Sequence, residues 1–144
     1  MAEGGGTGSL AHGIDRGVSY RIDRDRRLVV VTYIGAVTFE DIRTAQQMAR
    51  ADPAFDPGFA VLMDGLHADF SGLSAQDLAK IAQATPSSQG GRRAILVNSR
   101  LNYGLARMFA SISEAQGHGF PVAMFDNLED AVRWLTDPRG QGQG

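Results

Sequence analysis

Four side chains that can do chemistry fall within eight residues of this sequence, namely Asp64, His67, Asp69 and Ser71. Aspartate, histidine and serine are the groups of a nucleophilic triad, and two carboxylates with an imidazole can bind a divalent metal ion. A triad needs its groups in one line of hydrogen bonds, usually from separate loops, and no Gly-x-Ser-x-Gly pattern is present. The spacing of Asp64, His67 and Asp69 is not specific to any metal site. We therefore expect no catalytic centre and no metal site. An enzyme remains the third hypothesis, in which activity depends on His67.

Ser71 lies in the polar stretch "HADFSGLSAQDL", residues 67–78, between an apolar segment and a helical pattern. A phosphate on Ser71 would add about −1.5 to −2 charges near the positive end of that helix, which is a favourable place for an anion. The simpler interpretation is that Asp64 and Ser71 only form hydrogen bonds with the loop backbone. Both interpretations stay open, and the simpler one is favoured.

The elements around this loop are predicted from apolar periodicity. Strands are expected at 18–23, 28–35, 59–64, 93–98 and 121–125, and helices at 39–51, 75–84, 102–116 and 128–135. Thr38 with Asp41, and Ser74 with Asp77, have the spacing of capping boxes. Asn127 is the expected N-cap of the last helix.

The order of these elements, β-β-α-β-α-β-α-β-α, predicts an α/β domain of STAS-like layout. Strands that alternate with helices are joined by crossovers and therefore run parallel, whereas a tight turn makes the first two strands antiparallel. We expect a mixed five-stranded sheet with four helices, in which 18–23 is the edge strand. The domain would span 18–137, between a disordered leader at 1–17 and a disordered tail at 138–144.

In open α/β sheets, ligands and partners bind at the carboxyl ends of the parallel strands. Three connectors, 64–74, 99–107 and 126–127, should meet there, and we call them the rim. Ser99 and Asn102 stand where the fourth predicted strand gives way to the third helix. Tyr103 and Arg107, spaced i and i+4, should lie together on that helix.

Tyrosine and arginine often contribute most to interfaces, so Tyr103 and Arg107 indicate a partner surface. They should lie opposite the predicted buried face, which consists of Leu105, Met108, Phe109 and Ile112. The alternative is a partly buried tyrosine beside a solvated arginine. Arg92 and Arg93, at the start of the fourth strand, are interpreted as solvated turn residues.

Composition excludes several classes of protein. The 144 residues have 14 basic and 16 acidic side chains and a net charge of −2, so no bulk attraction to nucleic acid is expected. Cysteine is absent, which removes disulfides and thiolate metal sites and suits a reducing cytoplasm. No apolar run approaches the roughly 20 residues of a membrane helix. We expect a soluble cytoplasmic protein without a cofactor.

Several stretches together resemble the SpoIIAA-like, or STAS-like, family of bacterial proteins. They are "YRIDRDRRLVVVTYIGAVTFEDI", "FAVLMDGLHADFSGLSAQDLAKIA", "RRAILVN", "NYGLARMF" and "VAMFDNLEDAVRWL", which span most of residues 18–136. The resemblance implies a STAS-type fold related to anti-sigma-factor antagonists, and a kinship to CRAL-TRIO lipid-binding domains.

In the antagonists, a strand ending in aspartate leads to an Asp-Ser-Ser-Gly run that contains the phosphorylated serine. Here Asp64, Asp69, Ser71 and Gly72 match that pattern, which makes Ser71 the possible phosphosite. Phe70 replaces the first serine, and the loop between the two aspartates is shorter.

The function that we predict is a non-enzymatic regulatory or protein-interaction module of STAS type, with a switch at the loop before the second helix as a hypothesis. Its partner would be a protein, and a homodimer through an uncovered sheet face or edge is a further possibility. The alternative is a small-molecule or lipid-binding domain with an apolar pocket between that loop and the third helix.

Overall fold

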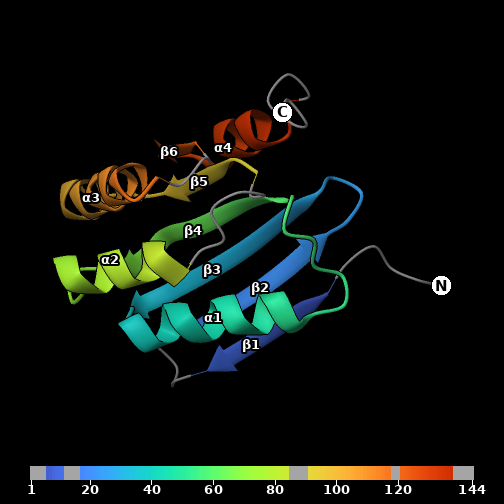
Figure 1. Ribbon diagram of the computed structural model, residues 1–144, viewed down its shortest axis with the longest axis horizontal. Coiled ribbons are helices and arrows are strands. Elements are labelled where there is room, and N and C mark those ends of the chain that lie inside the picture. The colour runs from blue at the N-terminus through green and yellow to red at the C-terminus, as the bar shows by residue number, and fades with distance from the viewer. Residues whose placement is uncertain (1–5, 12–16, 85–90, 118–120, 138–144) are drawn as a thin grey trace.

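The computed structural model describes residues 6–11, 17–84, 91–117 and 121–137, and these form a six-stranded sheet with helices on both faces (Figure 1). The strands are β1 (Thr7–Ala11), β2 (Gly17–Asp23), β3 (Leu28–Ala36), β4 (Ala60–Asp69), β5 (Arg93–Leu96) and β6 (Val122–Phe125). The helices are α1 (Phe39–Ala51), α2 (Ala75–Ala84), α3 (Arg100–Ala115) and α4 (Leu128–Leu135). None of these helices is long and apolar enough to cross a membrane.

The strands lie in the sheet in their sequence order, from β1 at one edge to β6 at the other. β1, β2 and β3 are antiparallel neighbours, and β3 to β6 are parallel. The mixed sheet and the four helices confirm the predicted α/β layout. The predicted count of five strands is wrong, because β1 precedes the strand that was expected at the edge.

β1 lies inside the stretch that was predicted to be a disordered leader. Its sequence, "TGSLA", has no alternating pattern that would identify a strand, and its register comes from pairing with β2, from Thr7 opposite Arg21 to Ala11 opposite Gly17. Gly8 suits this pairing, since a Cβ there would lie 2.2 Å from the Tyr20 ring. Gly6 of the predicted leader accepts from the Ile22 N–H, and Gly17 begins β2, whereas residues 1–5 and 12–16 and the predicted tail lie outside the described residues.

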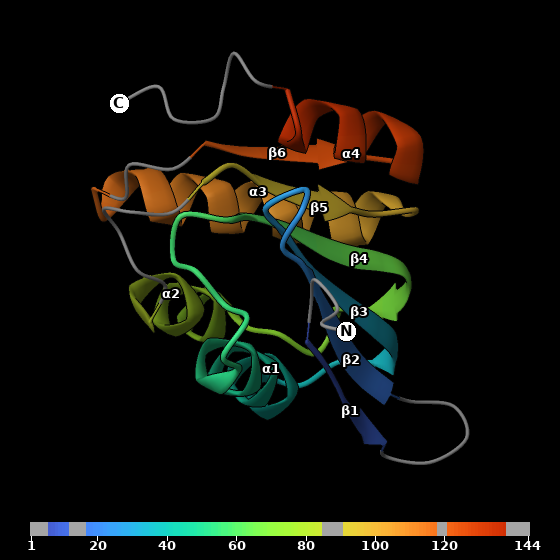
Figure 2. The ribbon, with the colours of Figure 1, turned by 90° about the vertical axis from the view of Figure 1, so that its right-hand side faces the viewer.

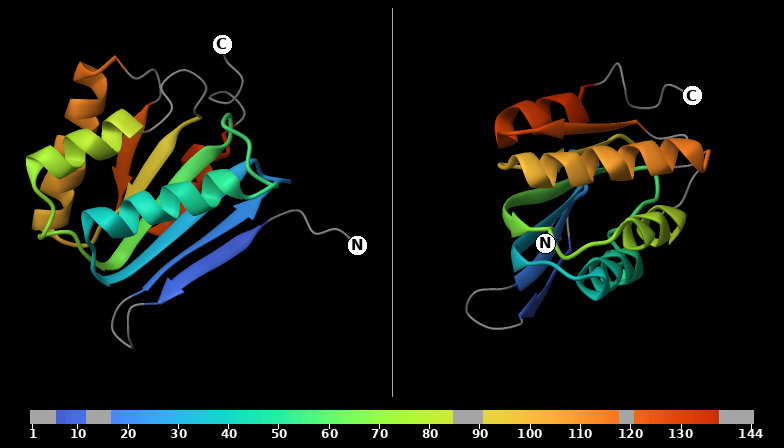
Figure 3. Two further views of the ribbon diagram at one scale, coloured as in Figure 1. Left: turned by 60° about the horizontal axis from the view of Figure 1, so that its bottom comes forward. Right: turned by 90° about the vertical axis from the view of Figure 1, so that its left-hand side faces the viewer.

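The sheet separates two apolar cores. α1, α2 and α3 cover one face, where Val31, Ile42 and Phe109 belong to the larger core. α4 packs on β4, β5 and β6 from the other face, where Leu62 and Leu135 are fully buried. Figures 2 and 3 show this arrangement from three directions, with α4 on the opposite side of the sheet from α1 and α2. β5 is therefore buried along its whole length.

Three of the four helix starts predicted from sequence are confirmed in hydrogen-bond detail, whereas α3 begins at Arg100, two residues before its predicted start. The Asp41 backbone N–H donates to the Thr38 hydroxyl at 3.1 Å, and the Thr38 N–H donates to the Asp41 carboxylate at 2.9 Å. Ser74 and Asp77 form the same reciprocal pair at 3.0 Å each. The Asn127 side chain accepts from the Asp130 N–H at 2.8 Å. Local sequence therefore fixes where three helices begin.

The buried face of α3 agrees with the predicted one at Phe109, which is buried, and at Leu105 and Ile112, which pack against the core, but not at Met108. Asn102, Ala106, Phe109 and Ser113 are its buried residues, whereas Met108 is 39% exposed. Two apolar side chains of α3, Met108 and Leu101, are left facing solvent.

Tyr20 ties the antiparallel part of the sheet to the end of α1. Its hydroxyl donates to the Asp52 carboxylate at 2.7 Å. Burial, followed by this hydrogen bond and the Asp52 charge, raises the pKa of Tyr20 to about 12. Because the folded pKa is raised, the stabilisation is present below the unfolded value near 10 and is lost as pH rises from about 10 to about 12.

The Tyr20→Phe variant should therefore lose about 1 kcal/mol of unfolding free energy at about pH 7. The difference from wild type should shrink at about pH 11, where unfolding lets the wild-type tyrosine ionise. Urea denaturation at both pH values measures this, with Tyr103→Phe as the exposed control. An equal difference at both pH values would contradict the assigned role of the Tyr20–Asp52 pair.

Candidate functional site

The carboxyl ends of β4, β5 and β6 meet at one end of the sheet, as the predicted rim requires. Asp64 is in register with Leu96, and Leu96 is in register with Phe125. The Val97 N–H also donates to the Phe125 carbonyl at 3.0 Å, which keeps β5 and β6 together just before they end. The segments that follow β5 and β6 therefore start side by side.

β4 continues five residues beyond its predicted end. Instead of leaving the sheet at Asp64, it runs to Asp69 and pairs with the end of β3, so that His67 lies opposite Ile34. A bulge between Thr32 and Ile34 makes this continuation possible, because it absorbs an extra residue of β4. Most of the presumed loop is thus strand, and Asp64 lies within it.

Gly65 at this bulge makes room for Phe70. A Cβ at Gly65 would lie 2.5 Å from the Phe70 ring and 2.9 Å from the Leu96 carbonyl oxygen. Phe70 is buried, and its ring meets Tyr33 edge to face with a centroid separation of 5.9 Å. The residue that replaces the first serine of the antagonist motif is therefore an apolar anchor, which holds the chain down between Asp69 and Ser71.

Asn102 fixes the same segment from the other side. The side chain of this buried α3 residue accepts from the Phe70 N–H at 3.1 Å and donates to the Ala68 carbonyl at 2.9 Å. One amide group thus bonds the backbone on both sides of Asp69. Asn98 adds a further bond to the Leu66 carbonyl. We call the Asn102 pair of hydrogen bonds the Asn102 clamp.

Asp69 and Ser71 are exposed on the outer side of the Asn102 clamp. The Ser71 hydroxyl, and then its backbone N–H at 2.9 Å, donate to the Asp69 carboxylate, and these bonds hold the pKa of Asp69 below its usual value. These hydrogen bonds within the turn agree with the simpler interpretation of Ser71 from the sequence, in which it only stabilises the loop. The hydroxyl also stays at the surface, four residues before the start of α2.

The start of α3 presents an exposed surface next to this turn. Ser99 is the N-cap, and its side chain accepts from the Asn102 N–H at 3.1 Å. Tyr103 is 45% exposed, with the Arg107 guanidinium 6.0 Å from its ring centroid, and Leu101 is 55% exposed. The alternative of a partly buried Tyr103 is therefore wrong, because Tyr103 and Arg107 form a pair that faces solvent. Sequence reasoning placed Leu101 within the rim and Asn98 at its border, but it assigned neither of them a contact.

The four groups of the possible triad do not converge, because Asp64 lies far from the hydrogen-bonded pair Asp69 and Ser71. Asp64 accepts from the Leu66 N–H at 3.2 Å and lines the α4 side of the sheet. His67 is exposed. At about 3.3 Å per strand residue, Asp64 and Asp69 are roughly 15 Å apart, which is beyond any shared hydrogen bond. Within the described residues, no three His, Asp or Glu side chains gather as a metal site would require.

The apolar space predicted between the loop and α3 is almost filled. Phe70, Leu73, Leu105 and Phe109 line a cavity of about 40 Å³ there, enough for a water-sized guest but far below the roughly 300 Å³ of a typical ligand pocket. The predicted pocket therefore exists only as a small packing gap, because Phe70 and Leu73 turn inward.

The face of β1, β2 and β3 beside α4 is less covered than the rest of the sheet. A hollow of about 630 Å³ lies there, with Ser19, Thr32 and Asp64 from the strands and Leu128 from α4 in its lining. Leu128 is half exposed at its border. An uncovered sheet face is what the homodimer hypothesis needs, and the dimer itself stays a prediction.

Comparisons with known proteins support the fold. No protein-family model matches the sequence, and the search of curated proteins gave no match. A solved structure that does match is an uncharacterised protein of the DUF3478 family, with a SpoIIAA-like fold, from Shewanella loihica PV-4. The two are 16% identical, the match covers 94% of this chain and 98% of that chain, and the TM-score is 0.51. The predicted SpoIIAA-like, or STAS-like, fold is confirmed.

The Asn102 clamp predicts a specific weakness. In Asn102→Leu, a side chain of similar size cannot accept from the Phe70 N–H or donate to the Ala68 carbonyl. The variant should lose about 1–3 kcal/mol of unfolding free energy, because buried backbone groups are left without partners. Native-state hydrogen exchange of the Phe70 amide should become at least tenfold faster.

Ser111→Ala is the matched control, since Ser111 lies on the exposed side of the same helix. It should change neither the unfolding free energy nor the exchange of the Phe70 amide. If Phe70 exchanges at the same rate in Asn102→Leu as in this control, the clamp does not hold the segment.

Proposed function

We propose that this chain is a non-enzymatic protein-interaction module of STAS type and that its partner binds the rim. Exposed groups of two kinds lie close together there, the Asp69–Ser71 turn and the α3 residues Leu101, Tyr103 and Arg107. The observation that supports the proposal most is the Asn102 clamp, since it holds the turn against α3. A partner could therefore contact both as one preformed surface.

The chemistry of the surface fits a protein partner. Tyr103 and Leu101 offer apolar area, and Arg107 adds a charge that is held over the tyrosine ring. Such residues are enriched where interfaces gain most of their binding energy. The wide separation of Asp64 from Asp69 and Ser71 supports a binding role over a hydrolytic one, because catalysis requires convergent groups.

Phosphorylation of Ser71 is the switch that we propose for this surface. A phosphate there would replace the hydroxyl that now donates to Asp69 and would set two negative groups side by side. Repulsion would open the turn while the Asn102 clamp keeps Phe70 in place. The change would therefore stay local and would alter the partner surface without unfolding the domain.

Photo-crosslinking tests the partner surface. A photoreactive amino acid at position 103, introduced in the native host, should give one discrete adduct with another protein. The same group at Gln47, which is exposed on α1, is the control and should not give that adduct. Arg107→Glu should reduce the adduct at least tenfold. Identical adducts at both positions, or none at position 103, would contradict the proposal.

The switch is tested in the same experiment. Ser71→Glu places a negative charge beside Asp69 and should weaken the adduct, whereas Ser71→Ala should retain it. Intact-mass measurement of protein from the native host should show one phosphate that is missing in Ser71→Ala. If no phosphate is found and both variants give the adduct as wild type does, phosphorylation of Ser71 as a switch is excluded. The proposal of a protein-interaction module is then unaffected.

A further inference from the structure

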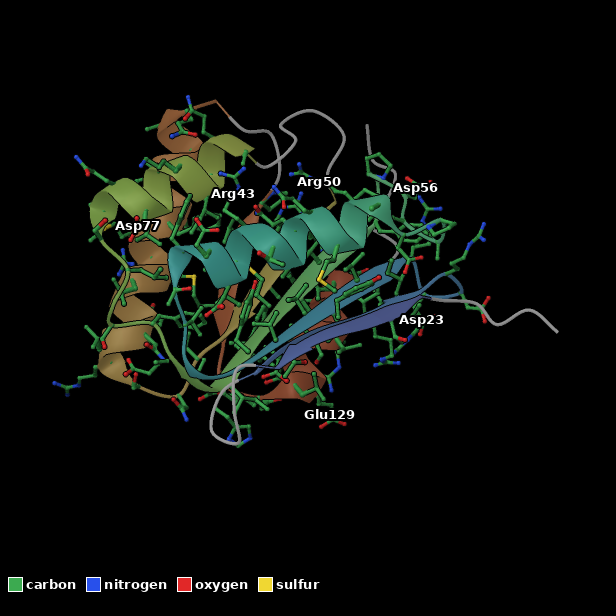
Figure 4. The ribbon with its side chains drawn as sticks, turned by 90° about the horizontal axis from the view of Figure 1, so that it is seen from below. Asp23, Arg43, Arg50, Asp56, Asp77 and Glu129 are labelled. Atoms are coloured by element: carbon green, nitrogen blue, oxygen red, sulfur yellow. The ribbon has the colours of Figure 1, made fainter. Side chains whose placement is uncertain are left out.

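The outer face of α3, a helix of 16 residues, is exposed along its whole length. Of the five large apolar side chains that are exposed within the described part of the chain, three lie on this helix. Figure 3 shows α3 running along the outside of the molecule. α2 packs against one flank of it, at the end of the molecule that Asp77 marks in Figure 4. The face that points away from the sheet is therefore open to a partner.

Five exposed residues form a straight line on this face, and we call them the α3 stripe. They are spaced i, i+3, i+7, i+10 and i+14, which are the contact positions of a helix that packs along a second helix. None of them is charged, and each of the two large apolar side chains is followed by a small residue. They are Leu101, Gly104, Met108, Ser111 and Ala115.

The contacts of a single chain do not explain Gly104. A Cβ at this position would meet nothing within 4 Å, so the fold does not require a glycine there. Glycine is also among the least favourable residues in the interior of a helix. At an exposed position, its small size lets another helix approach the backbone closely. Gly104 thus adds an independent reason to expect a helix on this face.

The α3 stripe is complementary to itself. When two copies of α3 lie antiparallel with their Ala106 residues level, Leu101 of one copy faces Ser111 of the other. In the same arrangement Met108 faces Gly104, so that each large side chain meets a small residue. A twofold axis makes each of these contacts twice, as in most homodimers.

The charges beside the stripe have the same symmetry. Arg100 and Glu114 are two heptads apart, so they flank the stripe on the same side, one near each end of the helix. In the antiparallel pair, Arg100 of each copy lies beside Glu114 of the other, whereas a parallel pair would set like charges together. Arg107 stands between them, but its guanidinium lies 6.0 Å from the Tyr103 ring centroid, on the side away from the stripe. Such charge pairs fix orientation more than they add affinity.

We infer that this chain forms a twofold homodimer in which the α3 stripes of two copies pack antiparallel. A helix of 16 residues is about 24 Å long, so the contact is smaller than a standard interface of roughly 1,600 Å² and the dimer should be weak. The inference goes beyond the partner surface at the rim, with which the stripe shares Leu101. It also differs from a dimer through the uncovered sheet face, because α3 lies on the other face of the sheet.

Disulfide trapping tests the arrangement, because the chain has no cysteine of its own. An oxidised mixture of Leu101→Cys and Ser111→Cys should give at least tenfold more linked pairs than either variant alone. Like positions would be ten residues apart along the antiparallel helices, about 15 Å, which is beyond the reach of a disulfide. Gln47→Cys, exposed on α1, is the control and should give no pairs with Ser111→Cys. Equal yields from the mixture and from each variant alone would exclude the antiparallel pair.

Gly104→Lys tests the dimer without unfolding the chain. Because the space around this position is open, the variant should melt at or above the wild-type temperature, but the lysine would keep the two helices apart. Sedimentation equilibrium should show a dissociation constant at least tenfold above that of wild type. Gln47→Lys adds the same charge to α1 and should dimerise as wild type does.

Charge exchange tests the symmetry. Arg100→Glu and Glu114→Arg should each weaken the dimer, and the double variant should restore it, because the exchanged charges pair again. The inference is overturned by a wild-type chain that stays monomeric at millimolar concentration, by unchanged dimerisation of Gly104→Lys, or by a double variant that remains as weak as the single ones. None of these results affects the adduct expected between position 103 and another protein, so failure of the dimer and failure of the proposed function are distinguishable.

Discussion

The buried amide of Asn102 joins parts of the chain that are distant in sequence. It reaches from α3 to the end of β4 and bonds two backbone groups, the Phe70 N–H and the Ala68 carbonyl. An asparagine amide can do both at once, because its oxygen accepts and its nitrogen donates. Because these partners are buried, their loss would leave polar groups unsatisfied, which is costlier than losing a surface contact. Ser71 and α3 therefore stay together.

The parallel strands give the molecule two chemically different ends. At the carboxyl ends, exposed groups gather around a turn whose backbone is held from below by Phe70 and Asn102. At the amino ends, Arg93, which was predicted to be a solvated turn residue, is only 7% exposed and lines a small, mainly apolar cavity.

Local patterns predicted the parts of this fold that depend on neighbouring residues. Thr38 with Asp41 and Ser74 with Asp77 marked helix starts because a capping box is complete within four residues. β1 was missed because its register comes from pairing with β2, and "TGSLA" alone contains no such signal.

The extension of β4 was missed for a similar reason. It depends on a bulge in the pairing with β3. The need for glycine at position 65 becomes visible only when the Phe70 ring is seen to pack against it. The candidate site shows the same division. Its location followed from parallel strands, but the role of Asn102 depends on burial by elements that are distant in sequence.

Backbone ¹⁵N relaxation of the rim tests the central claim most directly, namely that the turn and α3 form one rigid surface. The amides of Asp69, Phe70 and Ser71 should have order parameters near those of the core, about 0.85, despite the exposure of Asp69 and Ser71. Values below about 0.6 at these three amides would mean that the turn moves independently of α3, and would contradict the account.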